Sequence, residues 1–140
     1  MTGVLVLVGA LALAGIAGLV LKARNGRITR SAADTEAPAL PERVRAALDP
    51  GAAVTLVQIS TTFCAPCRHA KALLSHLADT TEGLRHVDLD VTETPEVAAG
   101  LGVLRTPTTL ALTPAGAELL RVGGVPKSDD LLAALRPHLP

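Results

Sequence analysis

The amino-terminal part of the chain is set apart by one long run of apolar residues. Residues 3–21 are nineteen residues without a charged side chain. As a helix, which rises about 1.5 Å per residue, this run would cross the ~30 Å hydrocarbon layer of a membrane, where only a helix satisfies its own backbone. A cleaved signal peptide is the alternative, but no basic side chain precedes the run. We therefore interpret residues 1–23 as a transmembrane anchor.

A basic and polar segment, residues 24–40, follows the anchor. Four basic residues lie on this side of the apolar run and none on the other: Lys22, Arg24, Arg27 and Arg30. Cytoplasmic flanks collect Lys and Arg, so we expect the rest of the chain in the cytoplasm, with the extracytoplasmic face as the alternative. The same charges favour contact with anionic head groups of the lipid bilayer. Residues 31–40 are small and polar without a period, which is typical of a linker.

Beyond residue 40, the chain alternates between two hydrophobic patterns. Short runs rich in β-branched residues predict strands at 53–60, 84–90, 108–113 and 118–123. Stretches with a period of 3.6 residues predict helices that begin at residues 41, 66, 95 and 128. The run at 53–60 has the apolar character of a strand buried on both faces.

This order of elements predicts one α/β domain over residues 41–140. A strand, helix and second strand form a right-handed parallel unit, and the closing hairpin adds antiparallel strands. We therefore expect a mixed four-stranded sheet covered by helices. About 110 residues remain after the anchor, which is enough for one compact core.

Charge limits the possible partners of this domain. The whole chain has thirteen basic and thirteen acidic residues. Setting aside the four basic residues beside the anchor leaves nine basic residues against thirteen acidic ones, so the remainder is net acidic. This balance argues against nucleic-acid binding.

The candidate chemistry lies in TTFCAPCRH, residues 61–69, which holds both cysteines and the only aromatic residue of the chain, Phe63. Cys64 stands between a predicted strand and a predicted helix. Unpaired N–H groups and the helix dipole stabilise an anion there, so we expect the pKa of the Cys64 thiol to fall below ~8.5. Pro66 suits the first helical turn, and Cys67 lies one turn further in. The pattern predicts thiol–disulfide exchange, in which Cys64 attacks a substrate disulfide and Cys67 resolves the mixed disulfide.

Three other interpretations of the cysteines are weaker. A structural disulfide would close a loop of only four residues and barely restrain the unfolded chain. A zinc site could use His69 and His76, but both lie on the same predicted helix and no second C-x-x-C pair completes a tetrahedral set. Two inert core cysteines would require Cys64 to be buried. We therefore expect no metal and no cofactor.

From residue 53 to its end, the chain resembles the thioredoxin family. FCAPC stands where the family usually has WCGPC, and TPT at residues 106–108 stands where it has a cis-proline before a strand. Gly123 in RVGG matches the family's glycine after the last strand. The resemblance implies a thioredoxin-like fold, protein disulfide or dithiol substrates, and an electron donor that the sequence does not identify.

The resemblance also implies a substrate-binding surface around the cysteines. Phe63 takes the place of the usual tryptophan on an apolar rim, with Ala65 and Pro66 beside it. A ring that fills the core is the alternative interpretation of Phe63.

The second part of that surface comes from the family's cis-proline. A cis bond before Pro107 would turn the backbone of Thr106 toward the sulfurs, where it can pair with an extended substrate. An ordinary trans proline would place nothing there. The resemblance favours the cis form and adds Gly123 to the same surface.

Departures from the family concern the supporting residues. Gln58 stands where thioredoxins bury an acidic residue beneath the second cysteine, and an amide cannot take a proton from Cys67, so resolution would rely on His69 or water. Arg68, where a lysine is common, would support the thiolate, although a solvated helix face is its alternative interpretation. We assign no chemistry to four other polar residues: His86, Asp88, Asp90 and His138.

The sequence therefore favours a membrane-anchored thiol–disulfide oxidoreductase, acting as a reductase because the expected compartment is reducing. A non-catalytic thioredoxin-like module that binds a partner in the same cleft is one alternative. An extracytoplasmic disulfide reductase or oxidase of the same fold is another.

Overall fold

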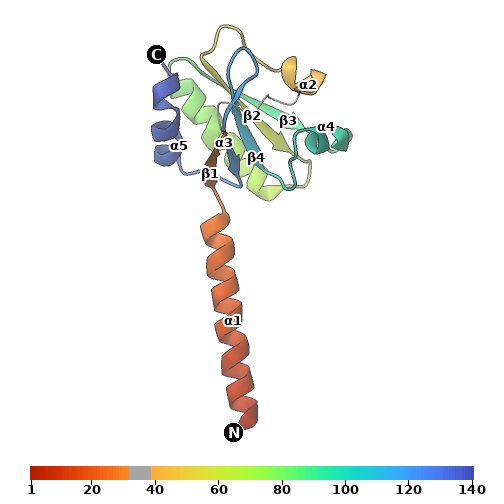
Figure 1. Cartoon of the computed structure of the whole chain (residues 1–140), viewed down its shortest axis with the longest axis vertical. Helices are drawn as coiled ribbons and strands as arrows, with labels where there is room; N and C mark the ends of the chain where they lie inside the picture. Colours follow the sequence, from red (N-terminus) through yellow and green to blue (C-terminus); the bar gives the residue numbers. More distant parts are fainter. Residues whose placement is uncertain (32–38) are drawn as a thin grey trace.

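A five-stranded sheet forms the centre of the structure, with its strands in the order β1-β5-β4-β2-β3 (Figure 1). The computed structural model describes residues 1–31 and 39–140, so most of the expected linker, residues 32–38, lies outside the described residues. The strands are β1 (Arg27–Arg30), β2 (Val54–Ser60), β3 (Leu84–Asp90), β4 (Thr108–Leu112) and β5 (Glu118–Gly123). The helices are α1 (Thr2–Arg24), α2 (Glu42–Arg45), α3 (Ala65–Thr80), α4 (Pro95–Gly100), α5 (Ser128–Leu135) and the short 3-10 helix η1 (Arg136–His138).

The strand β2 organises the sheet, because all seven of its residues are buried. It pairs in parallel with β3 and antiparallel with β4, and β4 pairs antiparallel with β5. The β2–α3–β3 crossover is the parallel unit that the sequence predicts, and β4–β5 is the predicted hairpin. The expected mixed α/β sheet is therefore confirmed.

Two hydrophobic clusters fill the two faces of this sheet. Leu56 of β2 belongs to the cluster that α3 and α5 cover, whereas Val57 and Ile59 belong to the cluster that α2 and α4 cover. Successive residues of a strand point to opposite faces, so β2 contributes to both clusters. Burying a leucine or isoleucine completely contributes roughly 1.5–3 kcal/mol, which makes these clusters the main source of stability. Figure 1 shows α2 and α4 on the side of the domain away from α5.

The sheet has five strands, and the prediction of four was wrong. The additional strand, β1, lies in the basic segment after the apolar run and pairs antiparallel with β5, from Arg27 opposite Gly123 to Arg30 opposite Leu120. Its one aliphatic side chain, Ile28, packs against the cluster on the α3 and α5 face. Four residues with a single large apolar side chain give almost no periodic signal, and arginines are equally typical of a membrane flank.

The strand β1 also changes how α1 is connected to the domain. Only Asn25 and Gly26 separate the end of α1 from the start of β1. The polar segment after Arg30, which the sequence suggests as a linker behind the anchor, joins β1 to α2 instead. The sheet therefore begins almost directly at the end of the apolar helix.

The helix α1 stands apart from the hydrophobic core. None of its residues is buried, and Figure 1 shows it as a straight stalk below the domain. Among the described residues it is the one helix long and apolar enough to cross a membrane, and a signal sequence near an amino terminus would have the same character. The anchor role of residues 1–23 therefore stays a prediction at this point.

The packing of β1 predicts how the domain responds to mutation of this strand. Because Ile28 is half-buried against the core, we expect Ile28→Ala to lower the free energy of unfolding by about 1–2 kcal/mol, less than the ~2–5 kcal/mol of a fully buried isoleucine. The measurement is chemical denaturation of the chain in detergent micelles. Thr29→Ala, an exposed change in the same strand, is the control and should stay within about 0.5 kcal/mol. Equal effects of the two changes would contradict a packed β1.

Candidate active site

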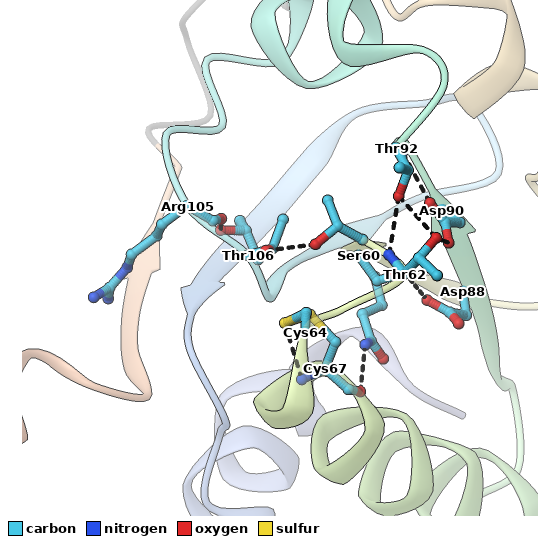
Figure 2. Close-up of a disulfide and its surroundings, with 12 residues drawn as sticks. Ser60, Thr62, Cys64, Cys67, Asp88, Asp90, Thr92, Arg105 and Thr106 are labelled. Atoms are coloured by element: carbon cyan, nitrogen blue, oxygen red, sulfur yellow. Dashed lines mark hydrogen bonds between the residues drawn. A yellow bond between two sulfur atoms is a disulfide. The ribbon is translucent and has the colours of Figure 1, made fainter.

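The two cysteines form a disulfide at the amino-terminal end of α3 (Figure 2). Their sulfurs are 1.99 Å apart and their Cα atoms 5.2 Å apart. Cys64 is the N-cap residue, with extended backbone, and its Sγ accepts a hydrogen bond from the backbone N–H of Cys67 at 3.2 Å. Pro66 lies in the first turn, where its missing N–H costs nothing. The predicted position between a buried strand and a helix is therefore confirmed.

The two sulfurs differ in their access to solvent. Cys64 is partly exposed, whereas Cys67 is 4% exposed. Cys67 lies on the inner face of α3 with Ala70 and Leu74, both fully buried. Cys64 is therefore the more accessible of the two cysteines. The partial exposure of Cys64 does not fit the alternative of two inert core cysteines.

An exposed surface surrounds Cys64. Phe63 is 95% exposed, which excludes the alternative that its ring fills the core. Ala65 and Pro66 are also exposed, on the other side of Cys64 in the chain. A second large apolar side chain, Leu104, is 98% exposed in the loop before β4, and the sequence did not single it out. One leucine in a loop carries no periodic signal by which the sequence could have found it.

The loop before β4 lies beside the cysteine segment. The peptide bond between Thr106 and Pro107 is cis, as the resemblance implied. The hydroxyl of Thr106 lies 3.5 Å from that of Thr61, three residues before Cys64, and Figure 2 shows Thr106 directed toward this segment. The carbonyl of Pro107 accepts a hydrogen bond from the N–H of Gly124, which ties the loop to the end of β5.

Gly123 lies next to this loop in the sheet. It pairs with Thr108, the first residue of β4, and its carbonyl accepts a hydrogen bond from Nη2 of Arg105 at 3.1 Å. A Cβ atom on Gly123 would lie 2.7 Å from the same nitrogen. The absence of a side chain thus lets the guanidinium of Arg105 lie across the strand end. A substrate contact of Gly123 stays a prediction.

A buried polar chain runs beneath the second cysteine. Gln58 is fully buried, and its Nε2 donates a hydrogen bond to the carbonyl of Cys67 at 2.8 Å. Its Oε1 lies 3.2 Å from Nε2 of His86, and Nδ1 of His86 lies 3.0 Å from the hydroxyl of Ser75. An amide oxygen can only accept, so His86 carries its hydrogen on Nε2 and its Nδ1 accepts from Ser75. We call these three residues, Gln58, His86 and Ser75, the polar chain.

The environment of His86 favours the neutral imidazole. Burial lowers the pKa of His86, the nearby carboxylate of Asp88 raises it, and the ammonium of Lys71 lowers it; the net direction is downward. The neutral ring is the form that the hydrogen bonds of the polar chain require. The sequence predicted Gln58 beneath Cys67 but assigned His86 no role, because only the β2–β3 register places His86 on the same face of the sheet.

The two aspartates of β3 fix the segment that precedes Cys64. Asp88 accepts a hydrogen bond from the hydroxyl of Ser60 at 2.5 Å and pairs with the Lys71 ammonium. Asp90 accepts a hydrogen bond from the hydroxyl of Thr62, and hydrogen bonds from Thr92 lower the pKa of Asp90. Figure 2 labels Asp88 and Asp90 with Ser60, Thr62 and Thr92, and these contacts hold the segment between β2 and Cys64 against the end of β3.

The remaining basic candidates lie on the exposed side of α3. Arg68 and His69 follow Cys67 directly and are both exposed, as is His76. Within residues 1–31 and 39–140, Arg68 forms no ion pair, so its support of the thiolate stays a prediction. Among the residues that the structure describes, no group of three His, Cys, Asp or Glu side chains is placed to hold a metal ion.

The burial of neutral His86 predicts a pH dependence of stability. Since its pKa is lower in the folded state, the unfolded chain binds the proton first as the pH falls below about 6.5. This contribution to stability is therefore complete above pH ~6.5 and is lost toward lower pH, with a slope of at most ~1.4 kcal/mol per pH unit, the value for one whole proton. The measurement is thermal unfolding between pH 5 and 7.5 for the natural chain and His86→Gln. Identical slopes for both would contradict this assignment.

Most of the sheet domain is similar in sequence to known proteins. The family model described as Thioredoxin matches residues 41–137. Thioredoxin H2 of Arabidopsis thaliana is 36% identical over 76 residues, which is 54% of this chain and 56% of that protein. The SPbeta prophage-derived thioredoxin-like protein YosR of Bacillus subtilis is 35% identical over 83 residues, which is 58% of this chain and 98% of that protein. The chain thus spans little more than half of the plant relative.

Solved structures agree with this comparison. Thioredoxin NaTrxh from Nicotiana alata is 30% identical, with a TM-score of 0.55 over 62% of this chain and 74% of that one. A mutant thioredoxin from Halobacterium salinarum has a TM-score of 0.57 over 64% of this chain and 77% of that one, and at 24% identity it shows the thioredoxin-like fold alone. Since the matched region includes both cysteines, the cis-proline and every strand from β2 to β5, the chain belongs to the thioredoxin family.

Proposed function

We propose that this protein is a membrane-anchored thiol–disulfide oxidoreductase in which Cys64 is the nucleophile and Cys67 the resolving cysteine. The observation that carries the proposal is the disulfide between an accessible sulfur and a buried one at the head of a sixteen-residue helix. Protein disulfides and dithiols are the substrates, as the family implies.

The reaction follows from the positions of the two sulfurs. In the reduced protein the thiolate of Cys64 is stabilised by the helix N-terminus and by the N–H of Cys67. It attacks a substrate disulfide, forms a mixed disulfide and releases one substrate thiolate. The sulfur of Cys67 then attacks Cys64, which releases the second substrate thiolate and leaves the internal disulfide seen in the structure. A separate electron donor must reduce this disulfide before the next cycle.

The polar chain holds Cys67 but does not accept its proton. The amide of Gln58 is neutral and already donates to the carbonyl of Cys67. The proton of Cys67 therefore passes to water or to His69, which is exposed two residues further along α3. This arrangement favours slower resolution than an acidic residue at position 58 would give.

The substrate lies across the exposed surface around Cys64. Phe63 supplies an apolar contact, with Ala65 and Pro66 beside it, and burial of such an exposed ring favours docking of a partner protein. On the other side of the sulfurs, the backbone of Thr106 before cis-Pro107 offers a peptide group to an extended substrate segment.

The proposed anchor is the exposed apolar helix α1, and the proposed location of the domain is the cytoplasm. Basic residues gather in the last turn of α1 and directly after it, which favours a cytoplasmic domain and therefore the reducing direction. An extracytoplasmic reductase or oxidase of the same fold is the alternative. The neutral Gln58 favours a second candidate, a non-catalytic module that binds partners in the same cleft.

Trapping of substrates separates an enzyme from a binding module. We expect Cys67→Ser to accumulate mixed disulfides with partner proteins, because no second sulfur releases them, and Cys64→Ser to accumulate none. Each change should also lower insulin-reduction turnover by roughly 100-fold or more, since the two sulfurs act as a unit. The measurement is non-reducing electrophoresis of acid-quenched cells beside the turnover assay. Wild-type turnover in both variants would exclude the proposed roles.

The orientation of the domain is tested separately. A reporter fused after Pro140 that is active only in the cytoplasm should be active, because the basic flank directs the carboxyl side inward. Exchanging Lys22 and Arg24 for glutamine should lower that activity, while the same exchange at the distant Arg136 is the control and should not. Activity of a reporter that works only outside the cytoplasm would instead support the extracytoplasmic alternative.

A further inference from the structure

The junction between α1 and the sheet is tied to the domain by hydrogen bonds. The N–H of Gly26 donates to the carbonyl of Gly123 at 2.8 Å. Nη2 of Arg105 donates both to the carbonyl of Arg24, the last residue of α1, and to that of Gly123, each at 3.1 Å. The end of α1 is therefore bound to the end of β5 through groups from three separate parts of the chain.

Close packing leaves this junction little freedom. A Cβ atom on Gly26 would lie 2.5 Å from the carbonyl oxygen of Val125, and one on Gly124 would lie 1.8 Å from Oδ1 of Asn25. Both glycines also have positive φ angles, 73° and 89°. The backbone of Gly26 thus packs against the backbone of Val125, and the backbone of Gly124 packs against the side chain of Asn25, so the end of α1 is closely packed on the end of the sheet.

The register of the sheet places this junction at the same end as the disulfide. Arg27 of β1 lies opposite Gly123, Gly123 opposite Thr108, and Thr108 opposite Ile59. With strands ~4.8 Å apart, this row is about 15 Å long. Thr108 directly follows cis-Pro107, and Ile59 lies five residues before Cys64. One row of the sheet therefore connects the end of α1 to both sides of the redox cleft.

Figure 1 shows the consequence of this register. The yellow-green start of α3, which carries the cysteines, lies at the lower end of the domain, from which α1 leaves. The turn between β4 and β5 and the chain's C-terminus lie at the opposite end. A strand rises ~3.3 Å per residue, and β4 and β5 have five and six residues. The turn between them is therefore roughly 17–20 Å further from α1 than the end of the sheet that carries the disulfide.

The same end of the domain is basic. Arg24, Arg27 and Arg105 line a cleft of about 470 Å³ together with Arg121. Arg121 is paired with Glu118, but within residues 1–31 and 39–140 the other three arginines have no carboxylate partner. Positive charge at this end is complementary to anionic lipid head groups and would hold it near the bilayer.

We propose that the Cys64–Cys67 pair faces the bilayer and that its substrates are protein disulfides held close to the membrane surface, in membrane proteins or their juxtamembrane segments. The proposal rests on the anchor and the exchange chemistry of the proposed function. Since α1 leaves from the disulfide end, a bulky soluble protein must enter between the domain and the lipid. A membrane protein presents its cysteines in that space already. The exchange itself is unchanged: the substrate disulfide is reduced and the Cys64–Cys67 dithiol is oxidised.

The orientation is tested with full-length chains in vesicles of phosphatidylcholine and phosphatidylglycerol. In the first variant, Cys67→Ser, a bimane label is attached to Cys64. In the second variant, both natural cysteines are replaced by serine and the label is attached to Ala115→Cys in the exposed β4–β5 turn. We expect lipids with nitroxide head groups to quench the label at position 64 at least twofold more than the label at 115. A flexible Gly/Ser insertion of about twenty residues between Arg24 and Asn25 is the matched control and should remove the difference. Equal or reversed quenching without the insertion would overturn the proposal.

The substrate class is tested in the same vesicles with one disulfide peptide in three forms. The first form of the peptide is free in solution. The other two forms are attached to a lipid head group, one through a short linker of about 10 Å and one through a long linker of about 80 Å. We expect the short-linked peptide to be reduced within threefold of the long-linked one, and a tenfold or greater deficit would overturn the inference. Loss of the chain from vesicles in carbonate would reject the anchor, and no reduction of the free peptide would reject the exchange chemistry. Those two results concern the proposed function and are distinct from the linker comparison.

Discussion

Burial of β2 on both faces is the constraint on which the rest of the structure depends. A strand that is paired on both sides and covered on both faces has no freedom to shift, so its carboxyl end is a fixed point in the domain. Only four residues separate Ser60 from the start of α3, and Thr62 among them is held by Thr92. Cys64 is thereby placed at the head of α3, where unpaired N–H groups favour a thiolate. The position of the reactive sulfur follows from the burial of a strand that carries no chemistry of its own.

The interior beneath the disulfide is polar yet neutral. An isolated buried carboxylate would be costly to desolvate, whereas the amide of Gln58 is satisfied at both ends without a charge. The polar chain begins at Ser75 on α3, crosses β3 and β2, and returns to Cys67 on the same helix. It therefore fastens α3 to the sheet at a second point and positions Cys67. A neutral amide at this place cannot accept a proton from the cysteine above it.

The apolar helix is part of the domain's architecture. A flexible tether would let an anchored domain sample many orientations, whereas a two-residue junction packed against Gly124 and bound by Arg105 permits few. Pairing of β1 with β5 also covers an edge of the sheet that would otherwise present unpaired backbone groups. The same four residues thus complete the sheet and hold the end of α1 beside the end of β5.

Much of this protein could be predicted from local sequence. The alternation of strands and helices, the burial of β2, the place of both cysteines and the position of Gln58 all follow from periodicity, helix-start chemistry and the family motif, which are encoded by residues near one another in the chain. The strand β1, the role of His86 and the contact of Arg105 with the end of α1 could not be predicted. They depend on pairs of residues 28 and 81 positions apart, and on the register between strands. The sequence by itself determined the elements from α2 to α5 and the place of the two cysteines at the head of α3, because local patterns specify both. Only the tertiary structure decided what lies beneath Cys67 and at which end of the sheet α1 joins the domain, because strand pairing, unlike periodicity, is a contact between distant segments that local patterns do not specify.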